Sequence, residues 1–212
     1  MEGTTTVPLK TLQFVALLLV GSVLTGMHPQ EAQAQPKLYP RLEVMAAGGA
    51  LFPLNEFGDN ADRGYLYSLQ AGWRVAKAST IGLSFMGSVT EATDTFRQNN
   101  MVPAGAKAEF PLWYMSLYYK QVAFEATFRP YIRIHMGGVK VEPEVDGASV
   151  SDVNVRFAMA GGFGLQWKDR WPIGAFTEFM YHQAILEEND PLTESDRRQF
   201  LTLRFGLSYD FL

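Results

Sequence analysis

Apolar residues alternate with polar or small residues through most of the chain after residue 34. From Leu201 to Phe211, apolar or aromatic residues occupy every odd position, and Thr, Arg, Gly, Ser and Asp occupy the even ones. The run from Val153 to Trp167 alternates in the same way, with Gly161 as its one interruption. Successive side chains of a strand point to opposite faces, so this pattern predicts β-strands with one apolar face. No window after residue 34 has helical spacing, and we expect no helix there.

The same alternation defines eight runs. They span residues 42–52, 65–75, 80–89, 110–121, 131–139, 153–167, 173–185 and 201–211. A strand of about 10 residues crosses a bilayer when it is tilted by about 45°. The run lengths therefore suit membrane-spanning strands.

Long and short connections alternate between the runs. The long ones are residues 53–64, 90–109, 140–152 and 186–199, and the short ones are 76–79 and 168–172. The connection 122–130 is of middling length and contains Phe124 and Phe128, so we interpret it as a strand extension or a compact turn. Long loops at one end and short turns at the other are typical of a membrane barrel.

Alternation alone does not distinguish a membrane barrel from a water-soluble barrel, because both have one apolar and one polar face. The non-aromatic face favours a membrane barrel, since it places glycines beside long charged residues and an eight-stranded interior is only wide enough for side chains. These glycines are Gly72, Gly82, Gly162, Gly164 and Gly206, and we expect them to make room for Arg74, Arg156 and Arg204. The prediction is an all-β, eight-stranded antiparallel up-and-down transmembrane β-barrel.

Aromatic residues gather near the ends of the runs. Amphipathic rings of this kind lie at the headgroup level on both sides of a bilayer. The expected membrane-interface residues are Tyr65, Trp73, Trp113, Tyr119, Trp167, Tyr209 and Phe211.

The first 34 residues have the three parts of a secretory signal peptide. Lys10 precedes an apolar run from Leu12 to Leu24, and Ala32-Gln33-Ala34 forms a small-x-small cleavage site. The apolar run is shorter than the about 20 residues that a transmembrane helix needs. We expect residues 1–34 to be a cleaved signal peptide and residues 35–212 to form one barrel domain.

Composition narrows the chemistry. The chain has no cysteine, which excludes disulfides, thiolate metal sites and a catalytic thiol. Its net charge of −4 gives no basic surface for nucleic acid. We expect no cofactor.

Acidic residues in the long gaps offer a weaker possibility, a divalent cation that bridges lipopolysaccharide, but their spacing fits no calcium-loop pattern. They are Asp59, Asp62, Glu142, Glu144, Asp146, Glu187, Glu188, Asp190, Glu194 and Asp196, with Asn60 among them. We expect no specific metal site.

Two segments resemble the small bacterial outer-membrane β-barrel superfamily, porin-like proteins with an OmpA/OmpX-type eight-stranded barrel. They are the glycine-studded run 160–167 (AGGFGLQW) and the closing run 203–211 (LRFGLSYDF). Members of this family usually end on an aromatic residue that the barrel assembly machinery reads, whereas here Leu212 follows Phe211. The resemblance implies an outer-membrane location, contact with outer-membrane lipids and lipopolysaccharide, and recognition of the C-terminal strand by that machinery.

With the apolar set outward, the polar positions of the runs define an expected network in the lumen. It consists of Glu43, Arg74, Arg133, His135, Arg156, Glu178, His182 and Arg204. Charges inside a narrow barrel are expected to pair with one another, because an unpaired ion there is costly. A lipid-hydrolysing site would need a serine beside a histidine and an acid to orient it, and neither histidine has a serine in strand-adjacent spacing.

We therefore expect a non-enzymatic outer-membrane barrel with a lumen largely filled by side chains. Its role would be in envelope structure or in surface interaction through the long acidic loops, whose partner the sequence does not name. A narrow channel for small solutes or ions is the alternative, and a lipid-modifying barrel enzyme is a more distant one.

Overall fold

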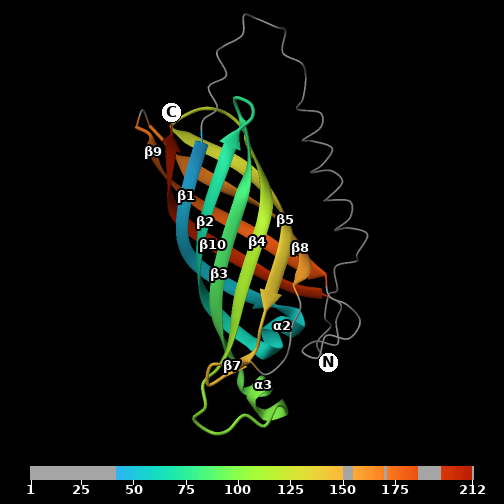
Figure 1. Cartoon of the computed structure of the whole chain (residues 1–212). Coiled ribbons are helices and arrows are strands. Elements are labelled where there is room, and N and C mark those ends of the chain that lie inside the picture. The colour runs from blue at the N-terminus through green and yellow to red at the C-terminus, as the bar shows by residue number, and fades with distance from the viewer. Residues whose placement is uncertain (1–41, 150–154, 170, 186–196, 212) are drawn as a thin grey trace, which may run out of the picture. The chain divides into compact units, whose positions relative to one another are not determined.

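The computed structural model describes residues 42–149, 155–169, 171–185 and 197–211, and within them eight long strands form a closed antiparallel barrel (Figure 1). The strands are β1 (Leu42–Leu54), β2 (Ala61–Arg74), β3 (Ser79–Ala92), β4 (Ala108–Val122), β5 (Phe128–Val141), β8 (Arg156–Trp167), β9 (Ile173–Ile185) and β10 (Arg197–Phe211). Each pairs with its neighbours along the chain, and β10 pairs with β1 to close the ring. The predicted fold class and all eight runs are confirmed.

The two ends of the barrel differ (Figure 1). The start of β1 and the end of β10 lie at the end where tight turns join β2 to β3 and β8 to β9, and we call this the turn end. The opposite end, the loop end, carries helices α2 (Asn55–Asn60) and α3 (Asp94–Asn99). It also carries a small hairpin of β6 (Glu144–Val145) and β7 (Ala148–Ser149), which pairs with the start of β4.

The β6–β7 hairpin is closed by a two-residue turn. Asp146 and Gly147 both have positive φ, 51° and 77°. Two residues in this region give the turn type whose twist matches that of paired strands, and Asp-Gly is a preferred sequence for it. The hairpin is thus specified locally.

The expectation of no helix was wrong for α2 and α3. Each has six residues and buries one aromatic side chain, Phe57 in α2 and Phe96 in α3. A helix this short cannot show the repeated three- and four-residue spacing by which helices are recognised. A local signal does exist for α3, because the Thr93 hydroxyl accepts the Phe96 N–H as an N-cap.

Both interpretations of the connection 122–130, a strand extension and a compact turn, hold for part of it. β4 ends at Val122 and β5 begins at Phe128, so residues 123–127 form a compact turn and Phe128 extends the strand. Phe124 and Phe128 are both exposed at this end of the barrel.

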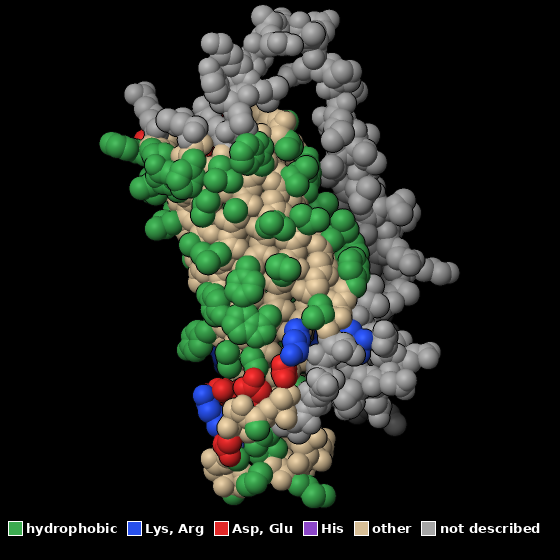
Figure 2. Space-filling model, in the orientation of Figure 1, with side chains coloured by type: hydrophobic (Ala, Val, Ile, Leu, Met, Phe, Trp, Pro, Cys, Tyr) green, Lys and Arg blue, Asp and Glu red, His purple; other side chains and the backbone are tan. Residues whose placement is uncertain are grey.

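The apolar face of the strands points outward. On β10, Phe205 is 58% and Leu207 61% exposed, whereas Arg204 between them is 1% exposed. Figure 2 shows hydrophobic side chains spread over the visible wall, with most charged side chains gathered near the loop end. No helix among the described residues is long and apolar enough to span a membrane.

Candidate functional site: the barrel interior

The interior has two halves of different chemistry. The half toward the turn end holds ionised and hydrogen-bonded side chains, and the half toward the loop end is an apolar cluster. The network predicted from sequence named only polar residues of the lumen, and the apolar cluster of the loop half was not part of that prediction. The inward face of β4 shows the change, from Phe110, Leu112 and Tyr114 near the loop end to Lys120 near the turn end.

Glu178 on β9 joins two arginines that are far from each other in sequence. Its Oε2 lies 2.8 Å from Nη1 of Arg133 on β5, and its Oε1 forms an ion pair with Nη2 of Arg204 on β10. The Tyr131 hydroxyl donates a third hydrogen bond to Oε2 at 3.1 Å. All of these side chains are buried, so one carboxylate ties β5, β9 and β10 together inside the barrel.

Glu43 on β1 organises a second group closer to the turn end. Its Oε2 accepts a hydrogen bond from Nζ of Lys120 at 2.5 Å, and its Oε1 accepts one from Nε2 of Gln166 at 2.9 Å. Gln166 also donates to Oγ of Ser208 at 2.8 Å. Lys120 and Gln166, absent from the network predicted from sequence, bring β4 and β8 into it.

Arg133 reaches across the barrel from β5. Its Nη1 donates to Oε1 of Gln70 on β2 at 2.5 Å, and its Nη2 lies 3.2 Å from Sδ of Met45 on β1. Its guanidinium also lies over the rings of Tyr118 and Tyr131, at 4.8 Å and 5.1 Å from their centroids. Arg133 thereby occupies the middle of the lumen.

The inward glycines make room for tyrosines more than for arginines. A Cβ on Gly72 would overlap the hydroxyl of Tyr118, and one on Gly164 would overlap the ring of Tyr131. Both tyrosines are buried. A bare backbone is thus needed where an aromatic ring crosses a lumen this narrow.

The two predicted lumen histidines are buried among aromatic rings. Nδ1 of His135 lies 2.9 Å from Oγ of Ser116, and Nε2 of His182 lies 3.0 Å from Oγ1 of Thr202. The statement that no serine neighbours a histidine was therefore wrong, because Ser116 lies on the adjacent strand β4. The other ring nitrogen of each histidine has no hydrogen-bond partner among the described residues, so no acid orients either imidazole.

Arg74 and Arg156 are half-buried, at opposite ends of the interior. Nη2 of Arg74 lies 3.5 Å from Oδ2 of Asp210, whose Oδ1 also lies 2.6 Å from Nζ of Lys168. Arg156 begins β8 near the loop end. The structure thus separates these two arginines from the central Arg133–Glu178–Arg204 cluster.

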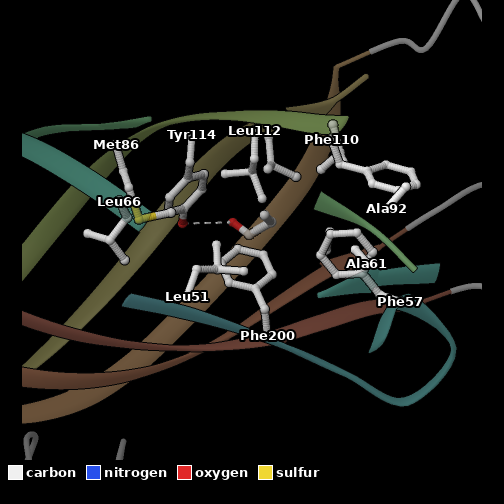
Figure 3. Packing of buried hydrophobic residues seen from close by; sticks show 14 of the residues in the cluster. Leu51, Phe57, Ala61, Leu66, Met86, Ala92, Phe110, Leu112, Tyr114 and Phe200 are labelled. Atoms are coloured by element: carbon white, nitrogen blue, oxygen red, sulfur yellow. Dashed lines mark hydrogen bonds between the residues drawn. The ribbon is translucent and has the colours of Figure 1, made fainter. Parts of the chain in front are cut away.

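The two helices of the loop end each add a phenylalanine to the apolar half, and Figure 3 shows Phe57 lying with Phe110 among the buried hydrophobic residues. Phe57 of α2 and Phe96 of α3 both pack edge-on against Phe110 of β4, with ring centroids 6.2 Å and 4.9 Å apart. Leu51 and Phe200 pack in the same cluster. We call the two helices α2 and α3, with their buried side chains Phe57 and Phe96, the cap.

Polar contacts connect the two helices of the cap. The Thr93 hydroxyl donates to the carbonyl oxygen of Asp59 at 2.6 Å, and the Thr93 N–H donates to the carbonyl oxygen of Asn60 at 3.0 Å. Nη1 of Arg97 donates to the carbonyl oxygen of Ala106 at 2.7 Å, across the loop that follows α3. The cap is therefore held by hydrogen bonds at the rim as well as by apolar packing below it.

Six of the seven aromatic residues expected at the membrane interfaces are exposed on the outer wall: Tyr65, Trp73, Trp113, Trp167, Tyr209 and Phe211. The seventh, Tyr119, is half-buried, and its hydroxyl donates to Oε1 of Gln121 at 2.5 Å beside the turn end. A ring on the apolar wall with its hydroxyl in a polar turn is the arrangement expected of an interfacial tyrosine.

Ion pairs at the loop end follow the rim of the barrel. Nζ of Lys107 lies 2.7 Å from Glu109, and Nζ of Lys140 lies 2.6 Å from Glu142. The hydrogen bond to Glu109 raises the pKa of Lys107, and the hydrogen bond from Lys140 lowers the pKa of Glu142. The backbone N–H of Lys107 also donates to Oδ1 of Asp146, which joins the β3–β4 loop to the β6–β7 hairpin.

Among the described residues, no group of three or more acids and histidines is arranged to hold a metal ion. Glu187, Glu188, Asp190, Glu194 and Asp196 lie outside the described residues. The predicted signal peptide, residues 1–34, lies outside them as well.

No protein-family model and no curated protein sequence matches the chain. Among solved structures, it is similar to Neisserial surface protein A (NspA), with a TM-score of 0.58 and 11% identity over 81% of this chain and 97% of that one. It is also similar to Ail, the attachment invasion locus protein of Yersinia pestis, solved in complex with the heparin analogue sucrose octasulfate. That match has a TM-score of 0.53 and 14% identity over 82% of this chain and 100% of that one. At these identities the likeness shows the fold, which is that of the small eight-stranded outer-membrane barrels.

Proposed function

From this fold as the premise, we propose that the protein is a non-enzymatic outer-membrane barrel whose lumen is closed by its own side chains and whose loop end is its working surface. The observation that carries the proposal is the pair of barriers in the interior. The Arg133–Glu178–Arg204 cluster crosses the turn half, and the apolar cluster beneath the cap fills the loop half.

The width of the barrel supports a closed lumen. Eight strands enclose a space about wide enough for side chains, whereas water-filled porins use 16 to 18 strands. The largest fully buried side chains include Arg133, Arg204 and Phe110, which belong to both halves of the interior. For ions to pass, the ion pairs would have to break and the cap would have to move.

The orientation follows from the termini of the barrel. The signal peptide expected before residue 35 would deliver the chain to the periplasm. Because the start of β1 and the end of β10 share the turn end, we place that end in the periplasm and the loop end outside the cell. Tyr209 and Phe211 are exposed on β10, where the assembly machinery would read the closing strand.

Surface interaction is assigned to the loop end because a rigid barrel presents its long loops to partners. The described loop residues are acidic in balance and carry the exposed Met101 at the tip that follows α3. Outer-membrane lipids and lipopolysaccharide would surround the wall below them. The Ser116–His135 pair does not support lipid hydrolysis, since it is buried and no carboxylate contacts its imidazole among the described residues.

Planar-bilayer conductance of the refolded chain tests the closed lumen. We expect the wild type to be silent and Glu178→Gln to leak, because the substitution removes the charge that holds two arginines. Glu125→Gln, at an exposed ion pair with Lys77, is the matched control and should stay silent. Steady openings of the wild type would overturn the proposal in favour of a narrow channel.

A further inference from the structure

The turn half of the interior carries more cations than anions. Five described cations face it: Arg74, Lys120, Arg133, Lys168 and Arg204. Three described carboxylates face it: Glu43, Glu178 and Asp210. Five positive and three negative charges leave +2, although the whole chain carries −4.

Two of these carboxylates are each shared by two cations, because Glu178 pairs with Arg133 and Arg204, and Asp210 pairs with Arg74 and Lys168. Glu43 pairs with Lys120. The further acceptors that Arg133 and Lys120 reach, Gln70 and Gln166, are neutral amides. The described side chains therefore do not balance the positive charge.

Buried donors without partners gather around Arg133. Within the part of the chain that the structure describes, its own Nε has no hydrogen-bond partner, and neither has Nε of Arg204, whose guanidinium binds the same carboxylate. Nε2 of Gln70 is unpartnered although its Oε1 accepts Arg133. The hydroxyl of Tyr118 is unpartnered too, and its ring lies under the Arg133 guanidinium.

Small side chains line the wall beside Arg204, which pairs with Gly49 of β1. β1 lies opposite β5 in the ring of eight strands, and Arg133 reaches it at Met45. The next inward positions of β1 toward the loop end are Ala47 and Gly49. The side chains on that wall are therefore among the smallest that a protein offers.

We propose that a small inorganic anion of about the size of chloride or bromide binds in the lumen among Arg133, Arg204, Gln70 and Tyr118. An unpaired buried charge costs far more than an unpaired neutral donor. Water satisfies donors but leaves the charge, whereas a halide accepts hydrogen bonds and offsets the positive charge at once. The site lies within the ion-pair cluster that closes the turn half of the lumen, and it does not depend on what the loops bind.

Bromide is the probe for a direct test, because its anomalous scattering locates it. Crystals of the full chain grown with sodium bromide in place of sodium chloride should show an anomalous peak in contact with the guanidiniums of Arg133 and Arg204. A lumen that contains water only, or bromide on the outer surface only, would overturn the proposal.

A solution experiment measures affinity with a benign variant. The unfolding temperature in detergent should rise with bromide but not with gluconate at equal ionic strength, since gluconate is too large to enter. Tyr118→Phe removes only an unpartnered hydroxyl, so the fold should persist while bromide affinity falls roughly threefold to tenfold, the value of one hydrogen bond. Tyr119→Phe, on the outer wall next to it, is the matched control and should keep wild-type bromide dependence. An equal rise with both salts, or a bromide response unchanged in Tyr118→Phe, would contradict the site.

Discussion

Glu178 forms ion pairs with two buried guanidinium groups, so its charge affects stability as well as closure. Glu178→Gln leaves Arg133 and Arg204 without their countercharge, and removing one partner of a buried ion pair costs about 3–5 kcal/mol. We expect that loss in the free energy of unfolding, measured by urea titration of the protein refolded in lipid. Glu125→Gln breaks an exposed pair and should change it by less than about 0.5 kcal/mol. Equal values for the two variants would show that the cluster is not a stabilising centre.

Substituting Gly164 by alanine adds one methyl group and tests how tightly Tyr131 is packed. The missing Cβ of Gly164 leaves the space that the Tyr131 ring occupies, so Gly164→Ala should destabilise the barrel by about 1–3 kcal/mol. Gly161→Ala, on the same strand but facing outward, meets only Cγ2 of Ile134 at 3.9 Å and should be neutral. Urea unfolding of both variants checks the difference. If Gly161→Ala proved the more damaging, the inward and outward faces of β8 would be reversed.

The limits of sequence reasoning for single residues are clearest on β4. Arg133, Glu178 and Arg204 could be placed in the lumen because each occupies a position of alternate parity to the apolar residues of its run. Lys120 could not, because β4 is apolar on both faces near the loop end: Phe110 and Leu112 point inward while Trp113 points outward. Because neither face of this strand is clearly polar, the pattern alone does not show whether the Lys120 side chain points into the lumen or outward.

Among the elements, the cap is the part of the fold that the alternation of the strands does not predict. Phe57→Ala and Phe96→Ala should each cost about 3–5 kcal/mol, since both rings are buried against Phe110. Met101→Ala, in the loop after α3 and 90% exposed, is the control and should be neutral. Urea unfolding gives the cost, and limited proteolysis of the loops reports opening of the cap. Loops that stay protected in both phenylalanine variants would show that the rim hydrogen bonds alone hold the cap.

The strands and the helices were not equally predictable, and the reason is physical. Every long strand has at least 12 residues, which is long enough for a period of two to repeat several times even where single positions break it. A six-residue helix such as α3 contributes only one buried side chain, and its N-cap is a local signal that occurs at turns as well. The apolar half of the interior was missed for another reason, because most of its members are apolar strand residues that point inward from strands whose outward face is apolar too.

For the molecule as a whole, the excess of positive charge in the turn half predicts the selectivity of any leak. Glu178→Gln removes one of three described carboxylates there, so the opened lumen should pass chloride more readily than potassium. The reversal potential in a potassium chloride gradient measures this preference. A cation-selective leak would show that the lumen charges are compensated otherwise or that ions take another route.

The central claim is that the apolar outer wall of the barrel lies in a lipid bilayer, and the tryptophans on that wall report on it. The chain has four, and all are exposed: Trp73 at 49%, Trp113 at 45%, Trp167 at 54% and Trp171 at 75%. The most direct measurement is quenching of their fluorescence after reconstitution into bilayers whose acyl chains are brominated. We expect strong quenching by the brominated lipid and little by aqueous acrylamide, with Trp113 and Trp167 each quenched when it is the sole tryptophan. Fluorescence that brominated lipid leaves unchanged while acrylamide quenches it would contradict the account.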